Sequence, residues 1–395
     1  MTLELNQVNT IFLAVALLVL GTFLVRKLGV LQKFCIPAPV VGGLLFATLA
    51  TILKATGVME ITLDTSLQSL FMLTFFTTVG LGASFQLIKL GGKLLVIYWL
   101  ACGFLALAQN AIGVSLASLF GLHPLIGMMA GAVSMEGGHG AASAFGQTIE
   151  AMGIPSALSI GVAAATFGLI AGGLVGGPTV KYLITKYNLK PTETAEVTTN
   201  AEEKLLPITT NTFFIQVLII TFCMALGTYL GGLFSSATGF VLPGYVGAMF
   251  VAVIVRNIID AFNPSTIDMK SISLISDVTL GLFLSMALMS IKLWEVADLA
   301  LPLLLIVLVQ VIFIVLFGIF ILFRMLGKDY DAAIMVAGFT GHGLGATPNA
   351  MANMAAVTER FGPSRKAYLI VPIVGAFLID VFAMPIIITT LNLFK

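Results

Sequence analysis

The sequence contains little charge. Asp, Glu, Lys and Arg make up 9% of its 395 residues, whereas a soluble domain carries about 25%. Hydrophobic residues make up 59%, and the mean hydropathy is +1.09. A water-soluble fold of this length cannot bury so much apolar surface, so the composition excludes a soluble protein. The net charge of +1 gives no reason to expect a nucleic-acid partner.

Cysteine and catalytic motifs are also scarce. The three cysteines, Cys35, Cys102 and Cys223, lie in apolar sequence without the spacing of a metal site, and their odd number argues against a complete disulfide framework. The sequence has no Walker A motif and no Ser–His–Asp arrangement. We therefore expect neither an enzyme nor ATP hydrolysis, and no cofactor. The N-terminal MTLELNQVNT lacks a basic stretch and a cleavage site, which predicts that the first apolar run is a retained helix.

Long apolar runs dominate the chain instead. Runs of about twenty residues have the length of a membrane-crossing helix, whereas the strands of a membrane barrel alternate over about ten. The runs cover residues 10–26, 38–56, 67–87, 94–120 and 157–180, and then 213–233, 243–261, 273–290, 299–323 and 368–391. We predict an all-α polytopic membrane protein with ten transmembrane helices.

Two glycine-rich polar segments interrupt these runs. One reads SMEGGHGAAS at residues 134–143, and the other reads GFTGHGLGATPN at residues 338–349. Such backbone at membrane depth must be buried in protein or line a water-filled cavity. The regions around them, residues 125–150 and 331–357, are too polar for an ordinary span and too apolar for an ordinary loop. We predict that each forms a re-entrant hairpin.

The two halves of the chain resemble each other. IPAPVVGGLLFATL (36–49) resembles VLPGYVGAMFVAVI (241–254), and this pair and the two glycine-rich segments are offset by about 205 residues. We predict a first repeat at 1–187, a linker at 188–211 and a second repeat at 212–395. An odd number of helices per repeat places the repeats in opposite orientations, which is the inverted-repeat plan of secondary transporters.

The basic residues predict how the chain is oriented. With the N-terminus outside, the predicted cytoplasmic segments hold sixteen Lys and Arg residues and the outside segments hold three. This strong positive-inside bias arises only if both glycine-rich segments are re-entrant and enter from opposite faces. We predict that both termini are periplasmic and that the linker is cytoplasmic.

Isolated polar residues inside the apolar runs are candidates for function. Asp380 lies within the last run, where an unpaired carboxylate costs about 2.5–3.5 kcal/mol, so it is a candidate cation ligand or partner of a substrate ammonium; a structural hydrogen-bonding role is the alternative. Asp277 is expected to be a structural acid near a helix start. Arg256 is expected to reach the cytoplasmic interface with its long side chain. His139 and His342, each between glycines, are expected to contact substrate or to form hydrogen bonds, and a proton relay remains open.

Two hairpins that enter from opposite faces bring their tips together near the midplane. Helix N-termini at such breaks bind anions, and helix C-termini present carbonyl oxygens to cations. This predicts an anionic substrate carried together with a small cation such as Na⁺. Oxygen ligands for that site are available on Ser134, Glu136, Ser143, Thr340, Thr347 and Asn349. The alternative is that the glycines only allow tight helix packing.

The whole chain resembles the bacterial glutamate:sodium symporter family. The resemblance is carried by SMEGGHGAASAFG (134–146), GFTGHGLGATPNAMANM (338–354) and IPAPVVGGLLF (36–46). That family is similar to the citrate/sodium symporters in its paired glycine motifs on two re-entrant loops. The resemblance implies uptake of L- or D-glutamate with Na⁺, a homodimer in the bacterial inner membrane, and an elevator mechanism. It also implies that the glycines of the two motifs, Gly137, Gly138, Gly140, Gly341, Gly343 and Gly345, form the hairpin tips.

These arguments assign a site. We predict substrate binding by Ser134, Glu136, Gly137, Gly138, His139, Gly140, Gly343, Gly345 and Asn349, and Na⁺ binding by Ser143, Thr340, Thr347 and Asp380. The alternatives are a proton-coupled organic-anion transporter, which the paired histidines and Asp380 would permit, and a channel. A purely structural membrane protein gives no reason for two polar interruptions.

Overall fold

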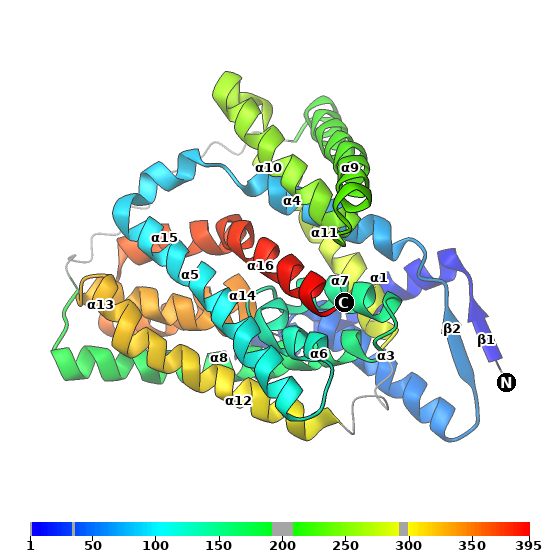
Figure 1. Ribbon diagram of the computed structural model, residues 1–395, viewed down its shortest axis with the longest axis horizontal. Coiled ribbons are helices and arrows are strands. Elements are labelled where there is room, and N and C mark those ends of the chain that lie inside the picture. The colour runs from blue at the N-terminus through cyan, green and yellow to red at the C-terminus, as the bar shows by residue number, and fades with distance from the viewer. Residues whose placement is uncertain (1, 34–35, 192–207, 292–298) are drawn as a thin grey trace.

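The computed structural model describes residues 2–33, 36–191, 208–291 and 299–395, and this part of the chain is almost entirely helical (Figure 1). Most of the predicted linker at 188–211 and Cys35 lie outside the described residues. Cys102 and Cys223 are buried free thiols, as their apolar surroundings predict.

The ten predicted helices are present in the described residues. Eight of them are long and apolar enough to cross a membrane: α1 (Gln7–Lys27), α3 (Ala38–Ala55), α5 (Gln86–Leu119), α8 (Ala157–Tyr187), α9 (Thr210–Thr238), α10 (Gly244–Phe262), α11 (Met269–Met289) and α12 (Ala300–Phe317), which continues through η5 (Gly318–Leu322) and α13 (Phe323–Met325). The other two are α4 (Gln68–Gly82) and a C-terminal run divided into α15 (Arg365–Ile373), the π-helix η6 (Val374–Leu378) and α16 (Ile379–Phe394). The protein is thus the multi-pass helical membrane protein that the composition predicts.

Polar residues start several of these helices. Asn6, Thr209, Asp268 and Ser364 precede α1, α9, α11 and α15, and the side chain of each accepts a hydrogen bond from a backbone N–H of the first turn. These bonds satisfy donors that have no partner within the helix. These four helices therefore begin at a capping side chain.

The helices form two bundles (Figure 1). The first bundle contains α1, α3 and α4 from the first half of the chain and α9, α10 and α11 from the second. The second bundle contains α5, α6 (Pro124–Met128), η1 (Met129–Val133), α7 (Gly138–Ala151) and α8, together with α12, α14 (Tyr330–Phe361), α15, η6 and α16. The bundles meet mainly where α7 lies against α11 and η6 lies against α4. Each bundle is therefore built from both halves of the chain.

A small sheet was not predicted from the sequence. Strand β1 (Thr2–Leu5) pairs in parallel with β2 (Glu60–Leu63) in the connection between α3 and α4. The pairing fastens the N-terminal residues to that connection. The remaining short elements are α2 (Gly29–Lys33) and the 3₁₀ turn η2 (Pro264–Thr266).

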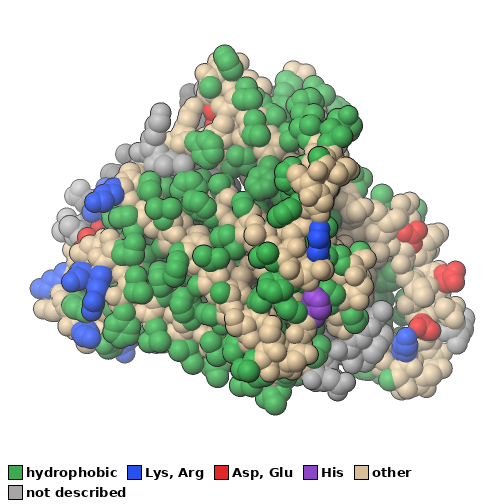
Figure 2. Space-filling view, in the orientation of Figure 1, with side chains coloured by type: hydrophobic (Ala, Val, Ile, Leu, Met, Phe, Trp, Pro, Cys, Tyr) green, Lys and Arg blue, Asp and Glu red, His purple; other side chains and the backbone are tan. Residues whose placement is uncertain are grey.

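Charged side chains lie toward the ends of the molecule. Figure 2 shows hydrophobic side chains across the middle of the visible face, with Lys and Arg gathered over the end that carries α13. Lys181, Lys186, Arg324 and Lys328 are exposed on α8 and around α13. All four belong to the predicted cytoplasmic set, so this end is the predicted cytoplasmic face.

The first glycine-rich segment folds into a helical hairpin, here called hairpin 1 (124–151). Residues 124–135 are helical, the chain breaks at Glu136 and Gly137, and α7 follows. A Cβ atom on Gly161 of α8 would lie 3.3 Å from the Cβ of Ala142 and 3.4 Å from the Oγ of Ser134. In one straight helix these two residues would be about 12 Å apart. The chain therefore turns back between them.

The second glycine-rich segment forms hairpin 2 (330–361) within α14. A straight helix of these 32 residues would hold its ends about 48 Å apart. The backbone is instead non-helical at Gly345 and Ala346, and the hydroxyl of Tyr330 donates to the carbonyl of Gly362 at 2.5 Å. Near the tip, a Cβ atom on Gly341 would collide with the backbone of Ala350, so only glycine lets the two arms pack this closely.

The tips of the two hairpins touch. Gly138 has a φ of 59°, which glycine adopts readily, and a Cβ atom at this position would lie 3.3 Å from the Cβ of Ala346. Ala346 is itself left-handed, with a φ of 63°, which costs a non-glycine residue roughly 1–2 kcal/mol. The membrane face from which each hairpin enters stays a prediction.

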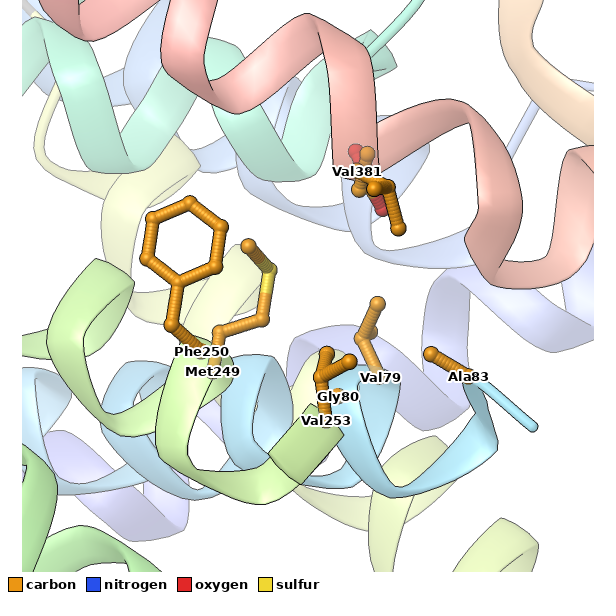
Figure 3. A pocket seen from close by; sticks show the side chains of 8 residues that line it. Val79, Gly80, Ala83, Met249, Phe250, Val253 and Val381 are labelled. Atoms are coloured by element: carbon orange, nitrogen blue, oxygen red, sulfur yellow. The ribbon is translucent and has the colours of Figure 1, made fainter. Parts of the chain in front are cut away.

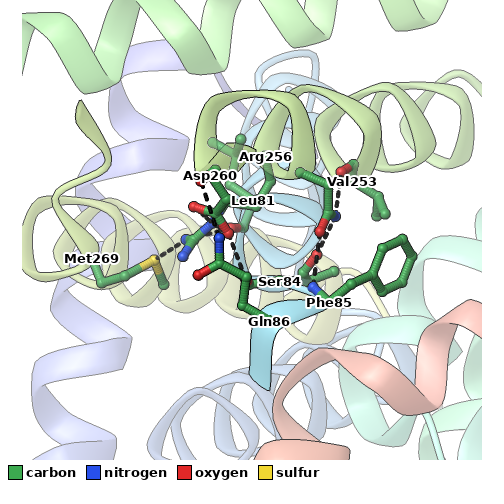
Figure 4. A network of polar contacts seen from close by, with 10 residues as sticks. Leu81, Ser84, Phe85, Gln86, Val253, Arg256, Asp260 and Met269 are labelled. Atoms are coloured by element: carbon green, nitrogen blue, oxygen red, sulfur yellow. Dashed lines mark hydrogen bonds and ion pairs between the residues drawn. The ribbon is translucent and has the colours of Figure 1, made fainter. Parts of the chain in front are cut away.

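Arg256 belongs to a network of polar contacts that the sequence analysis did not identify. Its side chain is paired with Asp260 at 2.9 Å and donates to the carbonyl of Leu81 at 3.0 Å. Asp260 also accepts a hydrogen bond from Ser84 at 2.5 Å, and Asn257 donates to the carbonyl of Ala83. Figure 4 shows this network between the ends of α4 and α10. Because these partners satisfy its charge, Arg256 serves to fix α4 to α10.

A polar contact also links the two bundles near the C-terminus. The Asn392 side chain in α16 accepts from the backbone N–H of Val241 at 2.6 Å and donates to the carbonyl of the same residue at 2.9 Å. Lys395 donates to the carbonyl of Gly239. These bonds, here called the C-terminal clip, attach α16 to the connection between α9 and α10.

Candidate substrate and ion site

A cavity of about 440 Å³ lies between the two bundles. The first bundle contributes side chains from α1, α4 and α11 and from the start of α3, including Phe75, Phe76 and Leu280. The second bundle contributes both hairpin tips, Leu169 of α8, and residues of η6 and α16. A cavity of this size can hold a small organic solute.

Most of the predicted site residues meet in this cavity. The structure places Glu136, Gly137, Gly138, His139, Gly140, Gly345, Thr347 and Asp380 on its wall. These residues come from both glycine-rich segments and from the last helix, which are up to 244 residues apart in sequence. The fold therefore brings the duplicated motifs together.

Five predicted residues lie off the cavity wall. The hydroxyl of Ser134 donates to the carbonyl of Gly161 at 2.8 Å, and that of Thr340 donates to the carbonyl of Val336 at 2.9 Å. The amide of Asn349 donates to the carbonyl of Leu169. The bonds of Ser134 and Asn349 attach the hairpins to α8, whereas that of Thr340 is local to its own helix.

The other two residues off the wall differ in their environment. The Gly343 carbonyl accepts from the side chain of Gln109 at 2.7 Å, which explains a polar residue inside α5. The hydroxyl of Ser143 is buried and has no partner among the described residues.

The cavity wall carries carboxylates but no Lys or Arg among the described residues. Neither Lys nor Arg occurs among the described residues that line it, whereas Glu136, Asp277 and Asp380 do. Glu136 is 4% exposed, and neither of its carboxylate oxygens has a hydrogen-bond partner in the described part of the chain. Burying an unpaired charge is costly, so this part of the wall is suited to a cation.

Asp277 was expected to be a structural acid near a helix start, and the structure places it elsewhere. The residue that caps α11 is Asp268, whereas Asp277 lies well inside the helix and lines the cavity. Leu280, Gly281 and Leu284 line the cavity from the same helix. Their spacing of three, four and seven residues from Asp277 marks one helix face, and this pattern could have revealed the role from sequence.

A tyrosine that the sequence analysis did not select orients His342. The Tyr98 hydroxyl lies 3.0 Å from Nδ1 of His342 and has no other hydrogen-bond partner among the described residues. Either the hydroxyl or Nδ1 can supply the proton of this hydrogen bond, so the tautomer decides whether the ring hydrogen of His342 is on Nδ1 or on Nε2. Nε2 has no partner within the described residues, and the side chain is 1% exposed. His342 therefore keeps one ring nitrogen without a hydrogen-bond partner among the described residues.

His139, the corresponding histidine of hairpin 1, has the opposite arrangement. Its Nε2 lies 3.0 Å from the hydroxyl of Thr166, and that hydroxyl donates its own proton to the carbonyl of Val162 at 2.9 Å. The hydrogen on Nε2 of His139 is therefore used within the protein. The two motifs are alike in sequence but offer different groups to a ligand.

A second, smaller cavity lies beyond Asp380. It has a volume of about 40 Å³ and is lined by Val79, Gly80, Ala83, Met249, Phe250, Val253, Asp380 and Val381. Figure 3 shows these side chains of α4 and α10 facing the start of α16. Asp380 thus lies at the boundary of the two bundles, with the large cavity on one side and apolar side chains on the other.

A helical membrane protein with a polar cavity between two bundles is organised as a membrane transporter. Comparison with known proteins identifies which transporters it is related to. The family model for the sodium/glutamate symporter matches residues 3–363. The sodium/glutamate symporter of Escherichia coli (strain K12) is 43% identical over 384 residues, which cover 96% of this chain and 95% of that protein. The chain belongs to the sodium/glutamate symporter family, which confirms the resemblance seen in its motifs.

More distant comparisons agree to different degrees. The sodium/glutamate symporter of Haemophilus influenzae is 40% identical over 387 residues, with 96% of both chains covered. A sodium–proton antiporter from Methanocaldococcus jannaschii matches 98% of this chain and 97% of its own, with 16% identity and a TM-score of 0.46. At that distance the structural likeness carries no conclusion about function.

Proposed function

We propose that this protein takes up glutamate together with Na⁺ across the bacterial inner membrane. The observation that carries the proposal is the single cavity in which both hairpin tips and Asp380 meet. The family to which the chain belongs supports the substrate and the ion. The proposal covers L- and D-glutamate.

The cavity wall supports a division of roles. The amide groups in the first turn of α7 and at the tip of hairpin 2 have no partners within their helices, and such groups bind carboxylates. Thr347 and Asp380 remain the proposed Na⁺ ligands on the wall. A loaded site in which Na⁺ balances the acidic groups costs less to move through the membrane than a charged one.

The two bundles support an elevator mechanism. In this proposal the second bundle carries the hairpins and moves against the first bundle, which forms the scaffold of a homodimer. The C-terminal clip must open during that movement, because it joins α16 to the connection between α9 and α10. The proposed orientation has two inverted repeats, periplasmic termini and a cytoplasmic linker.

Radiolabelled glutamate uptake into proteoliposomes tests the function. We expect accumulation when an inward Na⁺ gradient is imposed, and none when choline replaces Na⁺ or when the liposomes lack protein. Uptake that continues unchanged without Na⁺ would refute the coupling. Accumulation driven by a pH gradient at constant Na⁺ would instead favour the proton-coupled alternative, for which the histidines on the cavity wall are the supporting observation.

A further inference from the structure

We infer that Glu136 and Asp380 share one bound monovalent cation, and that this cation binds before the substrate. The inference deepens the proposed function and rests on it for the identity of the ion as Na⁺. The inference assigns Glu136 to the cation, whereas the sequence analysis predicted it as a substrate ligand.

The first argument is the state of the Glu136 carboxylate. The side chain is 4% exposed, and neither oxygen has a hydrogen-bond partner in the described part of the chain. A carboxylate buried in this way normally has a partner, because the protein must replace the water that it loses. The missing partner is a ligand that the cavity receives.

The second argument is the neighbour of Glu136. Asp380 reaches the same cavity from the start of α16, and two ionised carboxylates on one cavity wall repel each other. A proton on one of them, or a cation held between them, relieves this repulsion.

The choice between possible occupants follows from the surroundings. No Lys or Arg among the described residues lines the cavity, so the positive charge must come from solution. An alkali cation needs several oxygen ligands, and the two carboxylates can supply up to four, with the hydroxyl of Thr347 on the same wall. The substrate ammonium is the other candidate. It would arrive with two carboxylates that the unoccupied acidic pair repels, so the cation binds first.

The position of the pair also explains why the ion would organise the site. Glu136 belongs to the tip of hairpin 1, and Asp380 belongs to the last helix. A cation held by both joins the hairpin to α16 and fixes the tip, whose residues Gly138, His139 and Gly140 line the cavity. Binding of the ion therefore prepares the place where the substrate carboxylate binds.

Thermal unfolding of the purified protein without glutamate tests the inference. We expect Na⁺ to raise the unfolding midpoint of the parent protein, whereas choline has no effect. Glu136→Gln and Asp380→Asn should each raise the Na⁺ concentration for half-maximal stabilisation by at least about tenfold. Because one ion is shared, the double variant should show about the same loss as either single variant, rather than the product of the two. Glu60→Gln, a carboxylate change on the exposed strand β2, should behave like the parent.

A second measurement guards against variants that fail to fold. Glu136→Gln removes the repulsion from Asp380, so its unfolding midpoint in choline should equal or exceed that of the parent. The inference is wrong if Na⁺ stabilises the double variant as well as the parent. It is also wrong if glutamate alone stabilises the parent and Glu136→Gln abolishes this effect, since the ammonium would then be the occupant.

Glutamate uptake by the parent protein separates this inference from the proposed function. Uptake driven by Na⁺ with unaltered Na⁺ stabilisation in the variants would leave the function standing and remove the shared site. Loss of Na⁺ stabilisation in the variants without any uptake by the parent would leave the ion site standing and remove the function.

Discussion

Replacing Gly138 by alanine tests whether the contact between the hairpin tips matters for transport. The substitution forces an alanine into a φ of 59°, which costs roughly 1–2 kcal/mol. It also places a Cβ atom 3.3 Å from the Cβ of Ala346. Ala346 already has a left-handed backbone and is poorly placed to move away. Overpacking of this kind adds about 1–3 kcal/mol.

The chain offers a matched control for the backbone strain. Gly121 has a φ of 73°, and a Cβ atom there would meet no atom within 4 Å. Gly121→Ala should therefore lose roughly 1–2 kcal/mol of stability and keep its transport rate. Gly138→Ala should lose more stability and reduce Na⁺-driven glutamate uptake by about tenfold or more, because about 1.4 kcal/mol of additional barrier is a factor of ten.

A compensating change completes the test. Ala346→Gly removes the Cβ atom that the new side chain meets, so it should restore most of the uptake of Gly138→Ala while the strain at position 138 remains. The reasoning is refuted if Gly138→Ala transports like the parent. It is also refuted if Gly121→Ala loses uptake equally, or if Ala346→Gly gives no rescue.

Three further predictions concern single side chains. Tyr98→Phe removes the hydrogen bond to the His342 ring and should raise the KM for glutamate about three- to tenfold at unchanged maximal rate. This factor corresponds to the free energy of one neutral hydrogen bond. The control variant Tyr330→Phe should leave KM unchanged. Asp331→Ala removes the carboxylate that accepts from Ser364 at 2.6 Å and should lower the free energy of unfolding by about 1–3 kcal/mol. Lys366 is the exposed ion-pair partner of Asp331, and Lys366→Ala should lower it by less than about 1 kcal/mol. The hydrogen bond from Ser271 lowers the pKa of Asp268 below its ordinary 3.8. The stability that Asp268→Ala loses should thus be constant above about pH 5 and disappear as the pH falls through the lowered pKa.

The helical architecture was predictable from the sequence because hydrophobicity alone sets it. A run of about twenty apolar residues crosses a bilayer as a helix, because its backbone polar groups must be satisfied within the segment. The ten predicted runs correspond to helices of the structure. The strands β1 and β2 were not predictable in this way, because their stability depends on a pairing between residues almost sixty positions apart. The network around Arg256 was missed for the same reason, since its partners on α4 lie some 170 residues away.

The site was predictable as a region rather than as a set of contacts. Glycines mark the hairpin tips because the backbone requires them there, and both tips line the cavity. The sequence position of a hydroxyl or amide group does not indicate in the same way whether it faces the cavity. Ser134, Thr340 and Asn349 were selected by residue type, and the structure places them off the cavity wall with hydrogen bonds to backbone carbonyls. Tyr98 lies in an ordinary apolar run, and only the fold reveals that it faces His342.

The composition of the bundles affects how the protein can be made. Each bundle takes helices from both halves of the chain, so the first bundle is complete only after α11 has been synthesised and the second only after α16. Glu136 is synthesised 244 residues before Asp380, an interval of roughly 10–50 s at ordinary rates of translation. During that interval hairpin 1 carries its carboxylate without the helix that completes the site. The insertion machinery must therefore shelter a polar hairpin, and loss of the last helix should expose it to quality control.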